Sequence, residues 1–459
     1  MYNFRKCTLG VAPTRRDAFK NNRKDAINKR TESLCLKYDV NFVGIEGVAR
    51  EGLLVFSDEI EKIAKHFIAS EVDALFIPHA NFGQEEAVAK LAKLVNKPVL
   101  IWGPRDDAPL GISDQLEDRP YDVQCGLFAT GKALLSYGVP FTYIENCWIG
   151  SPVLDKGFED FIRTVCAAKA FSQARVGQMS TRPQPFLSVR YNESEILEKF
   201  GIEVVPIMES SVLDEVEHVL KDEPEAVQAQ LDKWERFLDM SSQDLEIRKK
   251  IAAAAVGIKR LAEFNGCTVM AGECWKMLRA AFGIGSCFIW GALTEEGLPV
   301  ICETDVLGAV GAGMLFGAAR SETVPFFADI TIRHPTNDNG ELLWHCGPFP
   351  YSLAKEPGKA YVEQCKGQFE IRGGDITLLR IGALKGKYTL FADEAAGIAG
   401  PKTNGTYLWI ETKNWPAWER KFVTGPYIHH MSGVHGKYKA AVHEAAKYLG
   451  DIEPDSIVN

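Results

Sequence analysis

The sequence predicts an α/β protein with two doubly wound, Rossmann-like domains built on parallel sheets, followed by a β-rich, barrel-like C-terminal domain. Strand-like and helix-like segments alternate through residues 1–165, and the alternation continues through residues 166–320. Short strands separated by Gly and Asn turns dominate residues 321–459. We therefore expect three domains with these boundaries.

The first domain is expected to hold a parallel sheet. Its strand-like segments are short apolar runs, and the segments between them have apolar residues at helical spacing. Helices of this length between strands imply right-handed crossovers, which produce parallel strands. The expected strands are 40–47, 73–80 and 97–104, and the expected helices are 58–72, 85–96 and 126–139.

The second domain is expected to open with a strand, loop, helix and strand over residues 174–207. The polar stretch 211–265 has apolar residues at helical spacing, which predicts a solvated pair of helices rather than an acidic tail. Strand-like segments follow at 268–275 and 298–306. The third domain is expected to contain strands at 323–332, 340–347, 368–373, 375–384, 387–395 and 406–412, and a closing helix at 436–450.

Composition and charge argue against several classes of protein. The chain has 459 residues, a net charge of −9 and 46% hydrophobic residues, which is typical of a globular protein with an extensive core. The negative charge argues against nucleic acid or an anionic membrane as the main partner. No apolar run reaches the ~20 residues of a membrane span, and MYNFRKCTLG lacks the pattern of a signal segment. The eleven cysteines form no CxxC pair, so we expect reduced thiols and a cytoplasmic protein.

The stretch ICETDV (301–306) carries two acids, Glu303 and Asp305, out of a strand-like run. Two residues apart on a strand, they would share one face. Carboxylates crowded on one face repel, so burying both requires a cation, a shared proton or a basic partner. The alternative is that they lie solvated at the end of the strand, with Asp305 capping the next helix. The glycines at 308–313 are interpreted as close helix packing.

Three histidines lie within GPYIHHMSGVHG (425–436), namely His429, His430 and His435. Adjacent histidines on a strand point to opposite faces, so one can enter a pocket while the other packs. A set of carboxylates and imidazoles suits Mn, Fe, Co or Zn better than Ca or Mg. A structural or surface cluster is the alternative interpretation.

Further polar residues follow strand-like runs. Asp329 in FADI and His345 in HCG could contact a substrate or support metal ligands, or could be a turn residue and a buried histidine. Glu273 is either a pocket ligand or a charge at a helix N-terminus. Arg15 and Arg16 follow the first strand, where loops of a parallel sheet line the ligand crevice, although a surface pair is the usual explanation.

These stretches, in this order, resemble the L-fucose isomerase/L-arabinose isomerase family over most of the chain. The resemblance implies a three-domain α/β protein that interconverts an aldose and a ketose, with a divalent metal expected to be Mn²⁺. It also implies a homo-oligomer, a trimer or hexamer, with its active sites between subunits. The segments that carry the resemblance are PTRRD (13–17), CETDVLGAVGAGMLF (302–316), FADI (327–330), HCG (345–347), DITLLRIG (375–382) and the pair His429–His430.

The resemblance also implies roles for single residues. Asp305, in the second domain, matches the family's second metal carboxylate, and His430, in the third, matches its metal histidine. The window upstream where the first metal carboxylate belongs reads IGSCFIWGA (284–292) and contains no acid. Glu273 is the nearest acid before it, so we expect Glu273 to complete the metal site.

Substrate contacts are expected from several other positions. Arg16 matches a sugar-binding position, and His429 falls where a polar residue contacts substrate. Glu303, Trp102 and His345 are expected to contact the sugar as well. These residues would surround a sugar whose two adjacent oxygens face the metal.

The predicted reaction moves a proton between C1 and C2 of a pentose, deoxyhexose or anionic sugar through a cis-enediol, with Asp305 and Glu273 as catalytic acid and base. Two alternatives stay open. The chain could be a non-catalytic sugar- or effector-binding member of the same fold, as the missing carboxylate suggests. It could also be an isomerase for a sulfo- or phospho-sugar, whose anion Arg15, Arg16 and Arg105 could bind.

Overall fold

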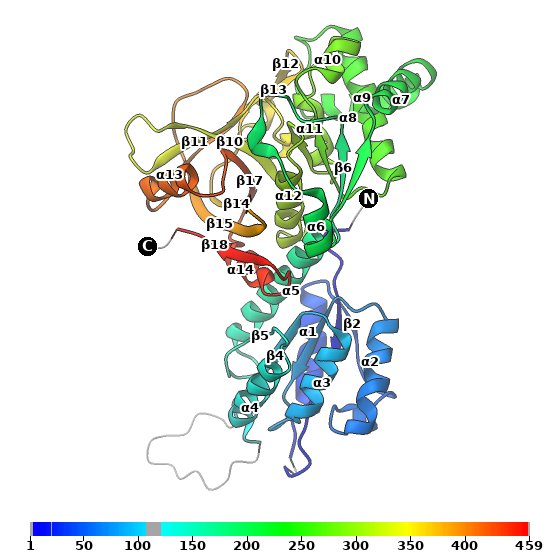
Figure 1. The fold of residues 1–459 in the computed structure, drawn as a ribbon, viewed down its shortest axis with the longest axis vertical. Coiled ribbons are helices and arrows are strands. Elements are labelled where there is room, and N and C mark those ends of the chain that lie inside the picture. The colour runs from blue at the N-terminus through cyan, green and yellow to red at the C-terminus, as the bar shows by residue number, and fades with distance from the viewer. Residues whose placement is uncertain (1–2, 20, 107–120, 458–459) are drawn as a thin grey trace. The chain divides into compact units, whose positions relative to one another are not determined.

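The computed structural model of this chain describes residues 3–19, 21–106 and 121–457. The chain divides into two compact units: an N-terminal unit, Arg5–Cys166, and a C-terminal unit, Ala167–Asn459, to which Phe4 also belongs. Both units carry parallel sheets, and the C-terminal unit also carries a large mixed sheet (Figure 1). The α/β class is thus confirmed, whereas the three-domain division stays a prediction.

The N-terminal unit is built on a sheet in which every described strand runs parallel to its neighbours. In order of pairing, the strands are β2 (Asn41–Val43), β1 (Thr8–Val11), β3 (Ala74–Pro78), β4 (Val99–Trp102) and β5 (Thr142–Tyr143). The helices between and after them are α1 (Lys24–Lys37), α2 (Ile60–Ala69), α3 (Glu85–Val95), α4 (Val123–Ser136) and α5 (Pro152–Ser172). The strand–helix alternation therefore produces the parallel sheet that the sequence predicts.

The C-terminal unit begins with a second parallel sheet. Its strands pair in the order β7 (Glu203–Ile207), β6 (Arg175–Met179), β8 (Val269–Gly272) and β9 (Val300–Cys302). The polar stretch 211–265 is helical, as expected, but it forms three helices rather than a pair, because Pro224 starts a new one. The helices of this part are α6 (Glu193–Phe200), α7 (Glu209–Asp222), α8 (Pro224–Glu235), α9 (Leu245–Phe264), α10 (Met277–Phe282), α11 (Cys287–Glu295) and α12 (Val306–Ala318).

The rest of this unit is a mixed sheet. Within the described residues its strands pair in the order β12 (Tyr361–Glu363), β13 (Lys366–Glu370), β16 (Thr406–Glu411), β11 (Gly340–His345), β10 (Phe326–Arg333), β17 (His430–His435), β14 (Asp375–Leu384), β15 (Lys387–Ile398) and β18 (Ile452–Asp455). Strand β15 also pairs with β16. Two helices, α13 (Trp415–Thr424) and α14 (Lys439–Ala446), accompany the strands. The β-rich end is confirmed, and its barrel-like form stays a prediction.

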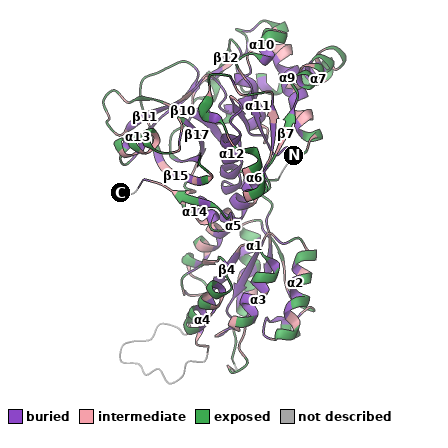
Figure 2. Ribbon diagram, viewed as in Figure 1, coloured by how far each residue is buried: buried purple, intermediate pink, exposed green. Residues whose placement is uncertain are grey.

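Helix α12 packs against both sheets of this unit, contacting β8 and β9 of one and β14 and β17 of the other. All of its residues are buried (Figure 2), as expected for a helix that is apolar on every face. Its glycines permit this packing. A Cβ at Gly311 would lie 2.7 Å from Leu379, and one at Gly308 would lie 2.9 Å from Phe327. The interpretation of these glycines as close helix packing therefore holds. The packing of α12 fixes the position of the residue at its N-terminus, Asp305.

Short 3₁₀ helices complete the secondary structure: η1 (Arg50–Gly52), η2 (Ser57–Glu59), η3 (Leu187–Val189), η4 (Tyr351–Leu353) and η5 (Pro357–Lys359). Among the described helices, we find none whose length and apolar character would let it cross a lipid bilayer.

A buried carboxyl lies on β11. Glu341 is 2% exposed and lines a cavity of about 320 Å³ between β10, β11 and α13. Burial raises the pKa of Glu341 from 4.5 to about 7, and the nearby Glu419 adds to the increase. The folded state therefore binds this proton more tightly than the unfolded chain does.

This difference predicts that the stability of the folded protein falls as the pH rises from about 4.5 to 7. In this range the unfolded chain has released the proton of Glu341, whereas the folded protein still retains it. The loss is on the order of 3 kcal/mol. In Glu341→Gln we expect the melting temperature to lose this dependence between pH 5 and pH 8, while Glu363→Gln, at an exposed position on β12, behaves as the wild type. Equal pH dependence in wild type and Glu341→Gln, measured by calorimetry, would refute the assignment.

Candidate metal centre

The turn between β9 and α12 presents Glu303. Strand β9 ends at Cys302, and the next residues, Glu303 and Thr304, have φ values of 63° and 56°. Two consecutive non-glycine residues in the left-handed region are strained, and such strain is concentrated at functional sites. The turn also corrects one expectation: Glu303 and Asp305 do not share a strand face, because both follow the end of the strand.

Asp305 is the N-cap of α12, as the alternative interpretation of the sequence had it. Its Oδ1 accepts the backbone N–H of Gly308 at 2.9 Å. The carboxylate is fully buried and also accepts two hydrogen bonds from the guanidinium of Arg380 on β14. Burial alone would raise the pKa of Asp305, but Arg380 and His430 together hold it well below its usual range. Asp305 is therefore an ionised carboxylate whose two oxygens are bound by protein donors.

His430 lies between the two acids. Its Nδ1 is 2.8 Å from Oδ2 of Asp305 and its Nε2 is 2.9 Å from Oε2 of Glu303. Burial lowers the pKa of His430, but its hydrogen bonds to both carboxylates outweigh this effect and raise the pKa to about 9. Asp305 thus fixes the ring orientation through Nδ1 and leaves Nε2 directed at Glu303, the arrangement that carboxylates impose on metal-binding histidines.

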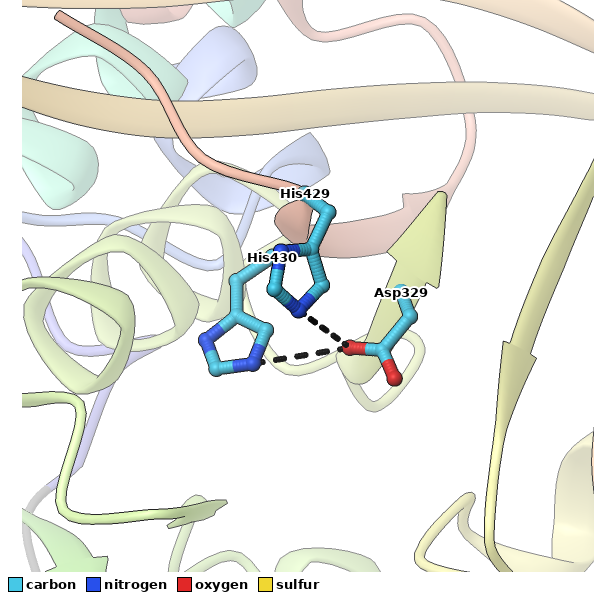
Figure 3. A group of neighbouring side chains, drawn as sticks. All are labelled: Asp329, His429 and His430. Carbon is cyan, nitrogen blue, oxygen red and sulfur yellow. Dashed lines mark ion pairs between the residues drawn. The ribbon is translucent and has the colours of Figure 1, made fainter. Parts of the chain in front are cut away.

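A third carboxylate, Asp329, reaches the same nitrogen. Asp329 on β10 is the register partner of His430 on β17, so their side chains lie on one face of the sheet. Its Oδ1 lies 3.5 Å from Nε2 of His430, 3.9 Å from Nε2 of His429 and 4.0 Å from Nε2 of His345. Figure 3 shows the rings of His429 and His430 both directed at this oxygen.

Two buried atoms at this point lack hydrogen-bond partners among the described residues: Oδ1 of Asp329 and Nε2 of His345. Buried polar atoms are normally paired, so these two atoms are available to a bound ion or polar ligand. One donor atom from each of Asp329, His429 and His430 lies within 4.8 Å of the others, and Glu303 meets His430 at the same nitrogen. Carboxylates with imidazole suit Mn, Fe, Co or Zn. The donor atoms of Asp329, His429 and His430 therefore fit a divalent ion, and Glu303 lies beside them at His430.

Aromatic side chains surround this centre. The indole N–H of Trp275 donates to Oε1 of Glu303 at 2.9 Å. Phe186 stacks on His429 with ring centroids 5.6 Å apart and meets His430 edge-on at 5.1 Å. Phe327 also packs edge-on against His430, with ring centroids 4.8 Å apart. These contacts restrict the rings that face Asp329.

His345, which is followed by Cys346, lies on a further polar side of the centre. Nδ1 of His345 accepts the backbone N–H of Cys346 at 2.9 Å. The ring proton of a neutral His345 therefore resides on Nε2, which faces Asp329. His345 is 3% exposed, so this N–H is directed into the site rather than to bulk water.

The structure differs from the sequence prediction at Glu273. This residue follows β8, and its carboxylate accepts backbone N–H groups of Trp275, Lys276 and Met277 at 2.8–3.1 Å. It thus occupies the start of α10, as the helix-charge alternative proposed. Both oxygens of Glu273 accept backbone N–H groups, and its role as a metal ligand or acid–base residue stays a prediction.

Arg16 and Trp102, which were expected to contact the sugar, belong to the N-terminal unit. Arg16 pairs with Glu85 at 3.0 Å and lies over the ring of Phe82. Trp102 is 1% exposed and donates its indole N–H to the sulfur of Cys147 at 3.4 Å. The structure thus gives Trp102 a packing role in the core of this unit.

Sequence reasoning gave Asp329 only a supporting or substrate-contact role and did not single out Arg380, Trp275 or Phe186. Asp329 could have been recognised only from the pairing of β10 with β17, which no local pattern reveals. Arg380 did leave a signal, because an arginine within the apolar run DITLLRIG (375–382) requires a buried acidic partner. Nothing in the local sequence distinguishes Trp275 or Phe186 from core aromatics.

Comparisons of the sequence with known families and proteins find fucose and sulfoquinovose isomerases. The family model of the fucose/sulfoquinovose isomerase N-terminal domain matches residues 10–172. The chain is 23% identical over 423 residues to a sulfoquinovose isomerase of Alkalicoccus urumqiensis, covering 88% of this chain and 89% of the relative. It is 21% identical over 388 residues to a sulfoquinovose isomerase of Priestia aryabhattai, covering 79% and 81% of the two chains.

Proposed function

We propose that the chain is a member of the L-fucose isomerase-like family and a metal-dependent isomerase that interconverts sulfoquinovose, a sulfonated aldose, with the corresponding ketose. The names of its relatives support an isomerase and this substrate. The metal requirement and the proton-transfer mechanism are proposals that rest on the candidate centre.

One observation carries the proposal: Nε2 of His430 faces both Glu303 and Asp329, while Oδ1 of Asp329 and Nε2 of His345 have no described hydrogen-bond partner. We propose that Glu303, Asp329 and His430 hold the ion, expected to be Mn²⁺. Asp305 then serves as the carboxylate that orients His430, rather than as a ligand. A bound divalent ion supplies charge stabilisation to two adjacent sugar oxygens and thereby acidifies the C–H bond beside them.

The chain's own residues move the protons. An aldose and its ketose differ by one proton transferred between C1 and C2 and one transferred between O1 and O2. Glu303 and Asp329 are the acid–base pair: one carboxylate takes the proton from carbon to give a cis-enediol, and a carboxylate returns it to the neighbouring carbon. The Nε2–H of His345, which faces Asp329 at 4.0 Å, donates to the sugar oxygen that gains negative charge.

Phe186, Trp275 and Phe327 have supporting roles in this scheme. Trp275 holds one oxygen of Glu303, which leaves the other oxygen directed at His430. The two phenylalanines fix the histidine rings and exclude water from one side of the site. A dry site strengthens the electrostatic contacts on which proton abstraction depends.

The sulfonate would be bound by arginine. Arg15, Arg16 and Arg105 follow strands of the N-terminal unit, where loops of parallel sheets bind ligands. Arg15 and Arg16 already pair with carboxylates of their own unit, so a sulfonate would compete with these partners. The resemblance further implies a homo-oligomeric trimer or hexamer with active sites between subunits, which we retain as part of the proposal.

The proposal is tested with protein stripped by EDTA and reloaded with Mn²⁺, Co²⁺, Zn²⁺ or Mg²⁺. We expect one ion per chain, a higher melting temperature, and turnover of sulfoquinovose that is restored by the ion. In D₂O, deuterium should appear at C2 of the recovered aldose. Sugar 6-phosphates and the neutral sugars fucose and arabinose serve as matched alternatives.

Each other outcome has a distinct meaning. Turnover by a metal-free chain would contradict the metal requirement. Stoichiometric metal binding without exchange at C2 on any sugar would favour the non-catalytic binding protein. Faster turnover of fucose or arabinose than of sulfoquinovose would contradict the anionic substrate while leaving the isomerase intact.

A further inference from the structure

Two cysteine thiols lie beside His345 of the candidate metal centre. Cys287 is the first residue of α11, and Cys346 follows the last residue of β11. Their sulfur atoms are 3.0 Å apart. Cys287 is 7% exposed, and Cys346 is partly exposed. The pair joins two elements that are distant in sequence but adjacent in the fold.

This geometry is close to that of a bonded pair. A disulfide holds its sulfurs about 2.05 Å apart, so an approach of about 1 Å converts the contact into a bond. Cys287 lies at the N-terminus of a helix of nine residues. From this arrangement we propose that Cys287 and Cys346 are a modification site at which a peroxide forms a disulfide.

The chemistry balances with hydrogen peroxide as the oxidant. The thiolate of Cys287 attacks one peroxide oxygen, an S–O bond forms, the O–O bond breaks, and hydroxide leaves and is protonated to water. The sulfur of Cys346 then attacks the sulfur of Cys287, an S–S bond forms, the S–O bond breaks, and a second water leaves. The two thiols lose two electrons and two protons in total, and the peroxide gains both electrons.

The surroundings of the two cysteines determine how fast they are oxidised and whether they are oxidised before other thiols. The hydrogen bond to Cys287, together with burial, raises the pKa of the Cys346 thiol, so Cys346 is expected to remain a thiol until it resolves the sulfenic acid. A competing pair exists, because Cys302 interacts with Cys274. Cys302 is 1% exposed, which makes that pair the less accessible to peroxide.

The bond would disturb His345. The ring of His345 accepts the backbone N–H of Cys346 at 2.9 Å, and its Nδ1 lies 3.3 Å from the Cys346 sulfur. Drawing Cys346 toward α11 therefore moves the ring whose Nε2 faces Asp329. A displacement of about 1 Å in an active site can cost about 10²-fold in rate. This consequence, unlike the disulfide itself, rests on the proposed function.

The test treats the reduced holoprotein with hydrogen peroxide and follows mass and turnover separately. We expect the loss of two hydrogen atoms, a crosslinked peptide that contains Cys287 and Cys346, and a fall in turnover of about 10²-fold that dithiothreitol reverses. Cys287→Ser should keep the untreated turnover, form no such peptide and resist peroxide. Cys125→Ser, at an exposed position in the N-terminal unit, should respond as the wild type.

Failure of the proposal is distinguishable from failure of the proposed function. A crosslink between Cys274 and Cys302, or oxidation to sulfinic acid without a crosslink, would overturn the proposal. So would a Cys287→Ser variant that loses turnover with peroxide as fast as the wild type. Because the peptide mass does not depend on turnover, the disulfide is tested even if the chain isomerises no sugar.

Discussion

Asp329→Asn should reduce turnover of sulfoquinovose by at least roughly 10³-fold, because the amide can neither accept a proton from carbon nor supply a negative charge to a cation. Affinity for Mn²⁺ should fall by about 10²-fold. The fold should be unaffected, since Oδ1 of Asp329 has no hydrogen-bond partner among the described residues. Steady-state kinetics, titration calorimetry with Mn²⁺ and the melting temperature of the metal-free protein measure these three effects.

A matched substitution separates the role of Asp329 from a general effect of charge. Asp338→Asn changes an aspartate whose side chain is fully exposed on a nearby loop. This variant should match the wild type in turnover, affinity and melting temperature. If Asp329→Asn kept turnover within tenfold of the wild type, Asp329 could not be the acid–base partner of Glu303.

Asp305→Asn should destabilise the C-terminal unit by about 3–5 kcal/mol, because it leaves Arg380 as a buried charge without its partner. Asp305 is 0% exposed and Arg380 is 4% exposed, so water cannot compensate. The same change removes the anion that orients His430, and affinity for Mn²⁺ should fall by about 10–100-fold. Urea unfolding followed by Trp fluorescence measures the first effect, and calorimetry measures the second.

The double variant Asp305→Asn/Arg380→Met provides the control. Removing both charges eliminates the uncompensated guanidinium, so stability should recover by a large fraction of the loss. Affinity for the metal should stay low, because His430 still lacks the carboxylate at Nδ1. If the single variant were as stable as the wild type, the buried ion pair would not support α12 and His430 as described.

These two substitutions have opposite signatures, and the contrast distinguishes two kinds of carboxylate. Asp329 is expected to matter for chemistry and little for folding, whereas Asp305 is expected to matter for folding and only indirectly for chemistry. The sequence alone could not separate them, because both are aspartates beside an apolar strand. Burial and the number of protein donors to each carboxylate make the distinction.

Much of the fold was predictable from local patterns. Alternating strand and helix signals in residues 1–165 predicted a parallel sheet, and the sheet β2-β1-β3-β4-β5 has parallel pairs throughout. The apolar stretch after ICETDV (301–306) predicted a packed helix, and α12 is buried along its whole length. Such patterns suffice because periodicity determines which face of an element is buried.

The site was predictable only in part. The convergence of Asp305 with His430 was expected, and the two side chains are 2.8 Å apart. Their relation was not expected, because it depends on Arg380, which reaches Asp305 from β14. Glu273 was assigned to the metal because it is the nearest upstream acid, but backbone N–H groups bind its carboxylate. Which acid faces a histidine is determined by strand pairing between distant segments, and one sequence carries no record of that pairing.

The most direct test of the central claim is a crystal structure of the protein with Mn²⁺, with an anomalous difference map recorded at the manganese edge. The account predicts a peak at coordination distance from a carboxylate oxygen of Glu303, Oδ1 of Asp329 and Nε2 of His430, with Asp305 still bound to Nδ1 of His430. A peak coordinated by Asp305 or Glu273, or no peak near His430, would contradict it.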